Sequence, residues 1–262
     1  RVRRQRQMCI RDSNKIALIT FYRALVTSGN LKPIDALIKR LLEQGINPLP
    51  VYVSSLKDQH SDEFIRELTV KLDISVVLNT TAFAVSSTES PAKTGPFRNT
   101  DCPVFQLILS SSEKDTWLAS PTGLSPRDIA MNVALPEVDG RLISRAVSFK
   151  SSDEYDRKTQ CSIVTYEPVQ DRISFVVNLI KGWIKLRDIP TDKKRLAIIL
   201  SNYPNKDSRI GNGVGLDTPA SAVSILKALR KRGYLIKNIP ENSASLMKMI
   251  KKGPTNNIFR SD

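Results

Sequence analysis

The chain has 262 residues, of which 40% are hydrophobic and 25% are charged, with three cysteines and one histidine. This share of hydrophobic residues is enough for a packed core and excludes an intrinsically disordered chain. No apolar run approaches the roughly 18–20 residues that a membrane-spanning helix needs. The scattered cysteines have neither disulfide nor metal-ligand spacing. The sequence therefore predicts a soluble protein of a reducing compartment, the cytoplasm.

The first thirteen residues, RVRRQRQMCIRDS, carry five arginines and no apolar block, so they do not form a secretory signal peptide. The string resembles translated read-through of a sequencing adapter, and we therefore expect residues 1–13 to be a non-native tail. An Arg-rich transit peptide and a nucleic-acid-binding arm are the alternatives. If the tail is not native, the true start of the protein is missing.

Positive charge is concentrated in the last quarter of the chain, within a total net charge of +14. Residues 14–190 hold 21 basic and 20 acidic side chains, whereas residues 191–262 hold 14 basic and 5 acidic ones, a net charge of +9. Such a field favours an anionic partner, whether a nucleic acid, an acidic protein face or a polycarboxylate ligand. For Lys227, Arg230 and Lys231, a solvated helix face is an equally good interpretation.

Strand and helix patterns alternate through residues 14–190. Short apolar runs predict strands, and apolar stripes at helical spacing predict amphipathic helices. The predicted strands are 15–21, 47–53, 74–79 and 103–110, and the predicted helices are 32–45, about 60–72 and 171–189. The last helix places five residues on one face: Ile173, Val176, Val177, Ile180 and Ile184. Strands alternating with helices predict a parallel α/β sheet.

The last quarter repeats this plan. Residues 195–200 have a strand pattern, and residues 218–233 have a helix pattern. Thr218 can cap this helix, with Pro219 at its first position. Residues 234–240 are a further candidate strand. True duplication is not required, because any two strand–helix–strand units look alike.

Pro190 ends the helix pattern between the two parts, so we expect the domain boundary near residue 190. The predicted fold class is α/β, with two Rossmann-like or flavodoxin-like parallel-sheet units. Residues 14–190 form the first unit, and residues 191–262 form the start of a second, truncated one.

Two long loops, residues 80–102 and 200–221, interrupt this scheme. Connections in compact α/β units usually have about 2–6 residues, and much longer ones are often functional. Both loops follow predicted strands, and ligands of open parallel sheets bind at the carboxyl ends of the strands. The sequence therefore predicts ligand contacts in these loops.

Several common sites are absent or weakly indicated. Residues 211–216, GNGVGL, nearly match the dinucleotide fingerprint but end in leucine and lie too far from the strand. No Gly-Lys-Ser/Thr occurs in the chain, which excludes a Walker A loop. His60, the single histidine, lies in a polar segment typical of a solvated surface.

One concentrated acidic segment, residues 132–141 (NVALPEVDGR), is a candidate for acid–base chemistry. Pro136 is expected to break the preceding pattern, and Glu137 and Asp139 follow in a turn closed by Gly140. In an extended turn, alternate side chains can project the same way and form a carboxylate pair for proton abstraction or cation handling. An ordinary surface turn is the alternative.

Four segments are distinctive when taken together: PVFQLILSSSEKDTW, GLSPRDIAMNVALPEVDGRLISRAVSFK, YEPVQDRI and LSNYPNKDSRIGNGVGLDTPAS. They closely resemble the large subunit of aerobic cobaltochelatase, which is homologous to the porphyrin-binding large subunit of magnesium chelatase. The resemblance runs from Lys15 to about Asn257. The last segment is more similar to the cobalt branch than to the magnesium branch. Members of this family are several times longer, which implies that the chain is an internal fragment.

The resemblance implies a large subunit that binds the metal-free ring while separate AAA+ subunits hydrolyse ATP with Mg²⁺, which this fragment would not bind. The ring would be hydrogenobyrinic acid a,c-diamide, a corrinoid of cobalamin biosynthesis, and Co²⁺ would be the metal substrate. We expect Glu137 and Asp139 to be catalytic, with Glu137 a possible metal relay. The expected ring contacts are Asn202, Asp207, Arg209, Gly211, Asn212, Gly213 and Asp217.

Two other functions remain open at this point. A magnesium-chelatase H-type subunit acting on protoporphyrin IX is the alternative within the same family. A basic Rossmann-like nucleic-acid-binding module would explain the charge of residues 191–262, but that part contains few aromatic residues to stack on bases. We therefore expect neither a nucleic-acid nor a membrane partner.

Overall fold

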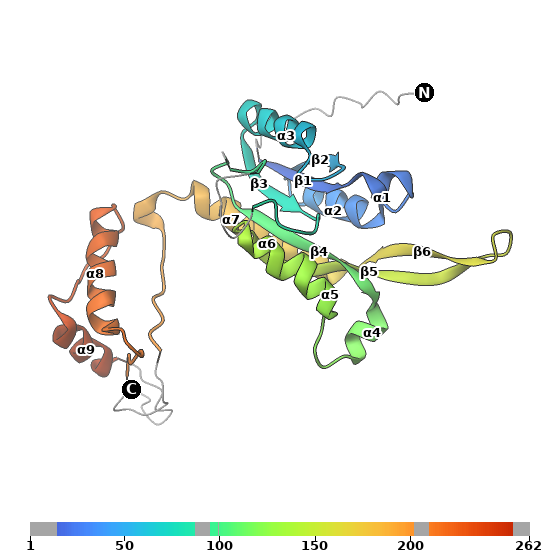
Figure 1. The fold of residues 1–262 in the computed structure, drawn as a ribbon. Coiled ribbons are helices and arrows are strands. Elements are labelled where there is room, and N and C mark those ends of the chain that lie inside the picture. The colour runs from blue at the N-terminus through green and yellow to red at the C-terminus, as the bar shows by residue number, and fades with distance from the viewer. Residues whose placement is uncertain (1–14, 87–94, 99, 202–209, 254–262) are drawn as a thin grey trace. The chain divides into compact units, whose positions relative to one another are not determined.

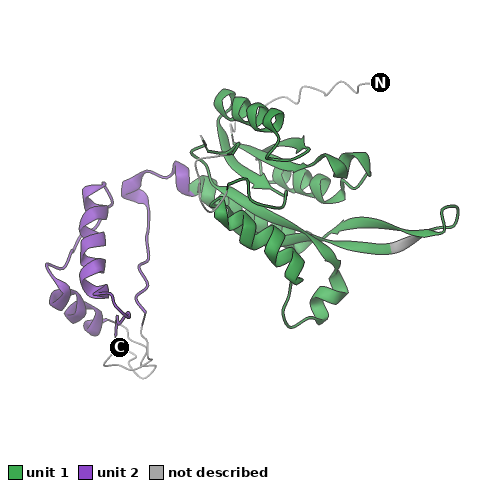
Figure 2. Cartoon of the chain, in the orientation of Figure 1, with its two compact units in different colours: residues 1–185 green, residues 186–262 purple. Residues whose placement is uncertain are grey.

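A computed structural model describes residues 15–86, 95–98, 100–201 and 210–253. The chain divides into two units, residues 1–185 and residues 186–262 (Figure 2). The division lies close to the boundary expected near residue 190. Among the described residues, no helix combines the length and apolar character needed to cross a bilayer.

Unit 1 is built on a six-stranded sheet in the order β2-β1-β3-β4-β5-β6 (Figure 1). The strands are β1 (Ile16–Tyr22), β2 (Asn47–Val53), β3 (Ile74–Asn79), β4 (Val104–Glu113), β5 (Leu142–Asp156) and β6 (Cys161–Pro168). Neighbours from β2 to β5 pair in parallel, and β6 is antiparallel to β5. The chain moves from β1 outward to β2 and then crosses back to β3, so the strand order reverses between β1 and β3. This order is flavodoxin-like, and the predicted α/β class is confirmed.

Helices cover both faces of this sheet. α2 (Lys32–Glu43) and α7 (Gln170–Asp188) pack against one face, where Ile19 and Val76 belong to the largest apolar cluster. α3 (Gln59–Lys71) packs against the opposite face through Ile65, in a second cluster with Leu18 and Val77. The five α7 residues that the sequence predicted to share a buried face are all buried. Two short helices, α1 (Arg23–Thr27) and α4 (Lys114–Ala119), directly follow β1 and β4.

A further helical run, residues 126–138, lies on the same face as α3. It consists of α5 (Pro126–Ile129), the π-helical turn η1 (Ala130–Ala134) and α6 (Leu135–Val138). The prediction that Pro136 breaks the pattern is wrong, because the helix continues through this residue. The N–H of Leu135 bonds to the carbonyl of Ala130 instead of that of Met131, and this wider turn accommodates a proline that has no N–H to donate.

Strands β5 and β6, which the sequence patterns did not predict, form a long hairpin that extends away from the rest of unit 1 (Figure 1). Asn30 closes part of the outer edge of β6. Its side-chain Nδ2 donates to the carbonyl of Val164 at 3.0 Å, and its Oδ1 accepts from the N–H of Tyr166 at 2.9 Å. A side-chain amide thus occupies two backbone groups that an adjacent strand would otherwise pair with.

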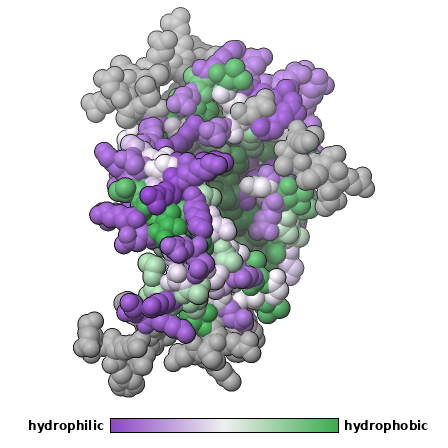
Figure 3. All heavy atoms as spheres, turned by 90° about the vertical axis from the view of Figure 1, so that its left-hand side faces the viewer, coloured by the Kyte–Doolittle hydropathy of each residue, from purple (hydrophilic) through white to green (hydrophobic). Residues whose placement is uncertain are grey.

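The described part of unit 2 contains η2 (Thr191–Lys193), α8 (Thr218–Lys231) and α9 (Ser243–Lys252). The predicted helix is confirmed, but the predicted strands at 195–200 and 234–240 do not form in the described residues. A strand needs a neighbour for its backbone groups, and these segments pair with none there. Several of their apolar side chains remain exposed, with Ile199 91% and Leu235 71% accessible. Figure 3 shows hydrophobic residues at the surface among hydrophilic ones.

Candidate functional site

A row of buried polar side chains crosses the sheet where β1 and β3 approach their carboxyl ends. Thr20, Asn79 and Gln106 are cross-strand neighbours on β1, β3 and β4, and all three are fully buried. The Thr20 hydroxyl donates to Asn79 Oδ1 at 2.7 Å, and Asn79 Nδ2 donates to Gln106 Oε1 at 2.7 Å. Buried polar groups that satisfy one another in this way hold neighbouring strands in one arrangement.

Arg141 and Asp139 extend this row toward the long loop after β3. Arg141 Nη1 donates to Gln106 Oε1 at 3.0 Å, and Arg141 Nη2 lies 2.6 Å from Asp139 Oδ2. The Arg141 side chain is 2% exposed and that of Asp139 is 11% exposed, so solvent has little access to the ion pair. Burial lowers the pKa of the Arg141 guanidinium from its ordinary value, and the Asp139 carboxylate opposes that shift.

Asp139 also fixes the start of the loop itself. Its two carboxylate oxygens accept the backbone N–H groups of Val85 and Ser86, each at 2.8 Å. The start of the 80–102 loop and the ALPEVDG segment, which are far apart in the sequence, therefore meet at this carboxylate. They meet beside the switch point of the sheet, where ligands of such folds bind.

Glu137 and Asp139 have different environments. The predicted extended turn is wrong: Glu137 lies within α6 and Asp139 is the C-cap of that helix. The oxygens of Asp139 accept hydrogen bonds from three donors, two loop N–H groups and the Arg141 guanidinium, which is typical of a residue that positions other groups. Glu137 is exposed to solvent, so its carboxylate is the one open to a ligand. Among the described residues, no three His, Cys, Asp or Glu side chains gather to form a metal site.

Asp128 is a buried carboxylate that the site prediction missed. It is 2% exposed and accepts hydrogen bonds from Ser110 Oγ at 2.8 Å and from the N–H of Ser111 at 3.0 Å. These bonds fasten the start of the 126–138 helical run to β4. The sequence signals only the start of a helix here, since the Ser125 hydroxyl accepts from the N–H of Asp128; it does not indicate that the Asp128 carboxylate reaches β4.

Three of the expected ring contacts, Asn202, Asp207 and Arg209, lie outside the described residues. Gly211 and Gly213 lie in the described part of the same loop. Gly211 has a φ of 71°, which glycine adopts readily. A Cβ on Gly213 would lie 2.8 Å from the Thr218 hydroxyl oxygen, so a larger residue there would force the Thr218 side chain to move.

The remaining two expected contacts have local structural partners. The carbonyl of Asn212 accepts from the Ser201 hydroxyl at 2.9 Å. Asp217 is the N-cap of α8, because its Oδ1 accepts from the N–H of Ala220 at 2.9 Å. The prediction that Thr218 caps this helix is therefore wrong by one residue. These bonds shape the loop and leave its contact with a ring as a proposal.

Asp217→Ala is expected to destabilise α8 by about 0.5–2 kcal/mol, because one N–H of the first turn loses its acceptor. Hydrogen exchange of the first-turn amides of α8 should become faster, whereas the exposed Asp192→Ala should leave it unchanged. Unchanged exchange after Asp217→Ala would mean that the carboxylate is not needed as a cap.

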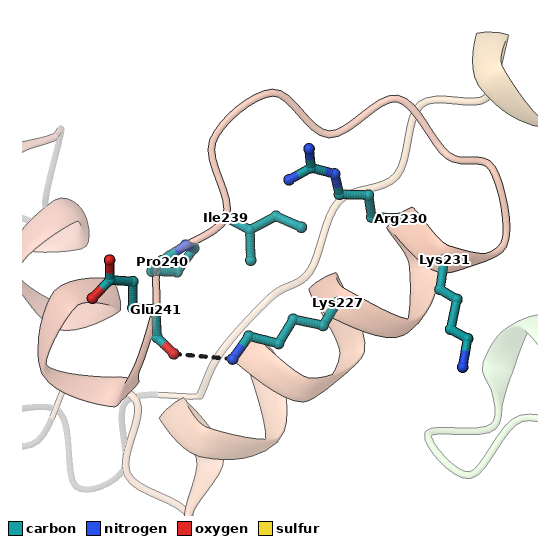
Figure 4. Close-up of a pocket in the computed structure, with 6 residues that line it drawn as sticks. All are labelled: Lys227, Arg230, Lys231, Ile239, Pro240 and Glu241. Atoms are coloured by element: carbon teal, nitrogen blue, oxygen red, sulfur yellow. Dashed lines mark hydrogen bonds between the residues drawn. The ribbon is translucent and has the colours of Figure 1, made fainter.

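Basic residues at the end of α8 line an open cavity of about 510 Å³ in unit 2 (Figure 4). Lys227 and Arg230 lie on the side facing Ile239 and Pro240, whereas Lys231 points elsewhere. The Lys227 ammonium donates to the carbonyl of Glu241 at 3.0 Å. Arg230 and Lys231 lie in the last turn of α8, where cations stabilise a helix. This local role explains much of the cluster without an anionic ligand.

The chain matches the protein-family model CobN/Magnesium Chelatase over residues 2–261. It is 45% identical over 91% of its length to the aerobic cobaltochelatase subunit CobN of a Sinorhizobium species, covering 19% of that protein. The corresponding subunit of Pseudomonas aeruginosa is 40% identical over 94% of this chain and is covered to 20%. The magnesium-chelatase H-type subunit of Chlorobaculum parvum is more distant, with 24% identity over 95% of this chain.

A solved structure agrees with this relationship. The catalytic subunit of cobaltochelatase from Mycobacterium tuberculosis superposes with a TM-score of 0.72 and 32% sequence identity, over 91% of this chain and 20% of that one. The chain thus spans about a fifth of the length of these relatives. The family match over nearly the whole chain and the shared fold lead to one conclusion: the chain belongs to the CobN/magnesium chelatase family.

Proposed function

We propose that the chain is part of the large, ring-binding subunit of an ATP-dependent cobaltochelatase of cobalamin biosynthesis. The observation that carries this proposal is the 45% identity to a cobaltochelatase subunit across 91% of the chain. Identity to the magnesium-chelatase subunit is 24% over a similar share, which favours cobalt over magnesium as the metal substrate.

Within this function, the substrate is hydrogenobyrinic acid a,c-diamide, a corrinoid that carries several carboxylates. The net charge of +9 on residues 191–262 complements such an anion. The loop at 200–221 supplies the proposed ring contacts. In its described part, Gly211 and Gly213 permit close approach of the backbone, and Asp217 caps α8. In this proposal, partner AAA+ subunits hydrolyse ATP, which agrees with the lack of a Walker A loop in this chain.

Metal insertion requires that the ring nitrogens lose protons and that the ion exchanges its water ligands for those nitrogens. We assign the proton acceptor and metal relay to Glu137, whose carboxylate is exposed on α6. Asp139 and Arg141 hold the neighbouring loop in place. Carboxylate oxygens are also suitable transient ligands for a divalent ion.

A ligand titration tests this proposal against its two alternatives. Hydrogenobyrinic acid a,c-diamide is expected to change its absorbance spectrum when the chain is added, and protoporphyrin IX to change less. A stronger response to protoporphyrin would favour a magnesium-chelatase-type subunit. Single-stranded nucleic acid that binds at about 50 mM salt and is released at about 200 mM, with no response to either ring, would instead support the basic-module alternative.

A further inference from the structure

Phe83, in the loop after β3, has an unusual backbone conformation. Its φ is 67°, in the left-handed region that glycine and asparagine enter far more readily than a bulky aromatic residue. Such strain persists only where the surrounding structure over-determines it, and it is concentrated at functional sites. The hydrogen bonds of the neighbouring loop residues should therefore show what holds Phe83 in this conformation.

The helical run 126–138 holds the backbone of Phe83 directly. The N–H of Phe83 donates to the carbonyl of Met131 at 2.9 Å. In a regular α-helix, that carbonyl would accept from the N–H of Leu135, but in the π turn this N–H bonds to Ala130 instead. Pro136, the next residue, has no N–H. The π turn and the proline thus leave one helical carbonyl available to the loop.

The residues on both sides of Phe83 are held equally firmly. The carbonyl of Thr81 accepts from Asn79 Nδ2 and Gln106 Nε2, each at 2.9 Å. The carbonyl of Ala82 accepts from the Tyr22 hydroxyl at 3.2 Å. On the other side, Asp139 accepts the N–H groups of Val85 and Ser86. Partners from three strands and from the helical run therefore impose this conformation.

The Phe83 side chain is only partly buried. It is 45% exposed and belongs to none of the three apolar clusters of the described residues, whereas its neighbour Ala84 is 7% exposed. Packing within the apolar clusters therefore does not account for a strained residue that stays nearly half exposed. Its position directly after β3, at the switch point of the sheet, is where this fold class presents ligand contacts.

We propose that the Phe83 ring is a binding contact for the flat, conjugated face of the tetrapyrrole. This inference rests on the proposed function and adds a residue to it. An exposed aromatic ring on a rigidly held loop offers an apolar face without the entropy cost of ordering the loop on binding. The 126–138 run that holds Phe83 through Met131 also carries Glu137, so one element supports both the ring contact and the proton acceptor.

Phe83→Asn separates this role from a structural one, because asparagine tolerates the left-handed conformation but has no aromatic ring. We expect an unchanged or higher melting temperature, and a dissociation constant for hydrogenobyrinic acid a,c-diamide raised about tenfold. That fold-change corresponds to about 1.4 kcal/mol, within the range of aromatic stacking on a flat ring system. Phe83→Gly should have the same two effects, and Phe83→Trp should keep the affinity.

Phe64→Ala is the matched control, since Phe64 is 52% exposed on α3 in the same unit. It should leave the dissociation constant unchanged. If wild type binds the corrinoid and Phe83→Asn binds it equally well, the inference is wrong while the proposed function stands. A melting temperature several degrees lower for both Phe83→Asn and Phe83→Gly would also overturn it, because the ring would then be structural. If wild type binds no tetrapyrrole, the proposed function itself fails.

Discussion

Arg141→Ala is expected to lower the free energy of unfolding of unit 1 by about 3–5 kcal/mol, because it leaves the Asp139 carboxylate buried without its counter-ion. The Arg141 side chain is 2% exposed, so water cannot readily replace it. Gln106 Oε1 also loses a donor, although Asn79 still bonds to it. Trp117 and Trp183, the two tryptophans of the chain, both lie in unit 1. Their fluorescence during urea unfolding reports the change.

Two comparisons isolate the ion pair in this experiment. Lys71→Ala removes an exposed partner of Glu67, whose pair has side chains 70% and 65% exposed, and should cost less than about 1 kcal/mol. The double variant Arg141→Met with Asp139→Asn should lose less stability than Arg141→Met and Asp139→Asn lose together when each is measured singly, because neither charge is then left unpaired. A loss below about 1 kcal/mol for Arg141→Ala would show that the loop does not depend on this pair.

Glu137→Gln is expected to slow metal insertion at least ~100-fold in a full-length subunit with its partner subunits, because it removes the proposed proton acceptor. General bases typically contribute about 10²–10⁴-fold in rate. The amide keeps the shape of the side chain, so the affinity for the ring should change little. Single-turnover insertion, followed by the absorbance of the ring at saturating concentration, measures the rate separately from binding.

Glu67→Gln, on the exposed surface of α3, is the matched control and should insert the metal at the wild-type rate. Asp139→Asn should behave differently from Glu137→Gln, because Asp139 holds the backbone of the loop. It should weaken ring binding and lower stability as well as slow the reaction. A wild-type rate for Glu137→Gln would mean that the exposed carboxylate is only part of a helix surface.

Hydrophobic periodicity was sufficient to predict much of unit 1. Strands β1 to β4 and helices α2, α3 and α7 bury one or both faces, and such burial leaves a regular apolar pattern in the sequence. The β5–β6 hairpin was missed because its outer part covers no core. Apolar residues such as Tyr155 and Val164 are exposed there, so apolar and polar positions in the sequence do not mark a buried and an exposed face. The predicted strands of unit 2 had the right pattern but find no partner in the described residues.

The candidate site was only partly predictable for a different reason. The sequence identified Glu137 and Asp139 as carboxylates in a distinctive segment, and the loop after β3 as unusually long. It could not indicate that Asp139 accepts from the backbone of Val85 and Ser86, which are more than fifty positions earlier in the chain. The π turn before Pro136 likewise depends on packing and has no pattern of its own.

Asn30 has a consequence for how unit 1 behaves in a concentrated solution. The outer edge of a sheet is a template on which another chain can add a strand, and sheets grow into aggregates from such edges. Because the Asn30 amide occupies the carbonyl of Val164 and the N–H of Tyr166, an incoming strand would first have to displace it. The beginning of β6, which precedes these two residues, has no such cover from Asn30. Self-association through β6 would therefore have to start near the tip of the hairpin, where only a short length of strand could pair.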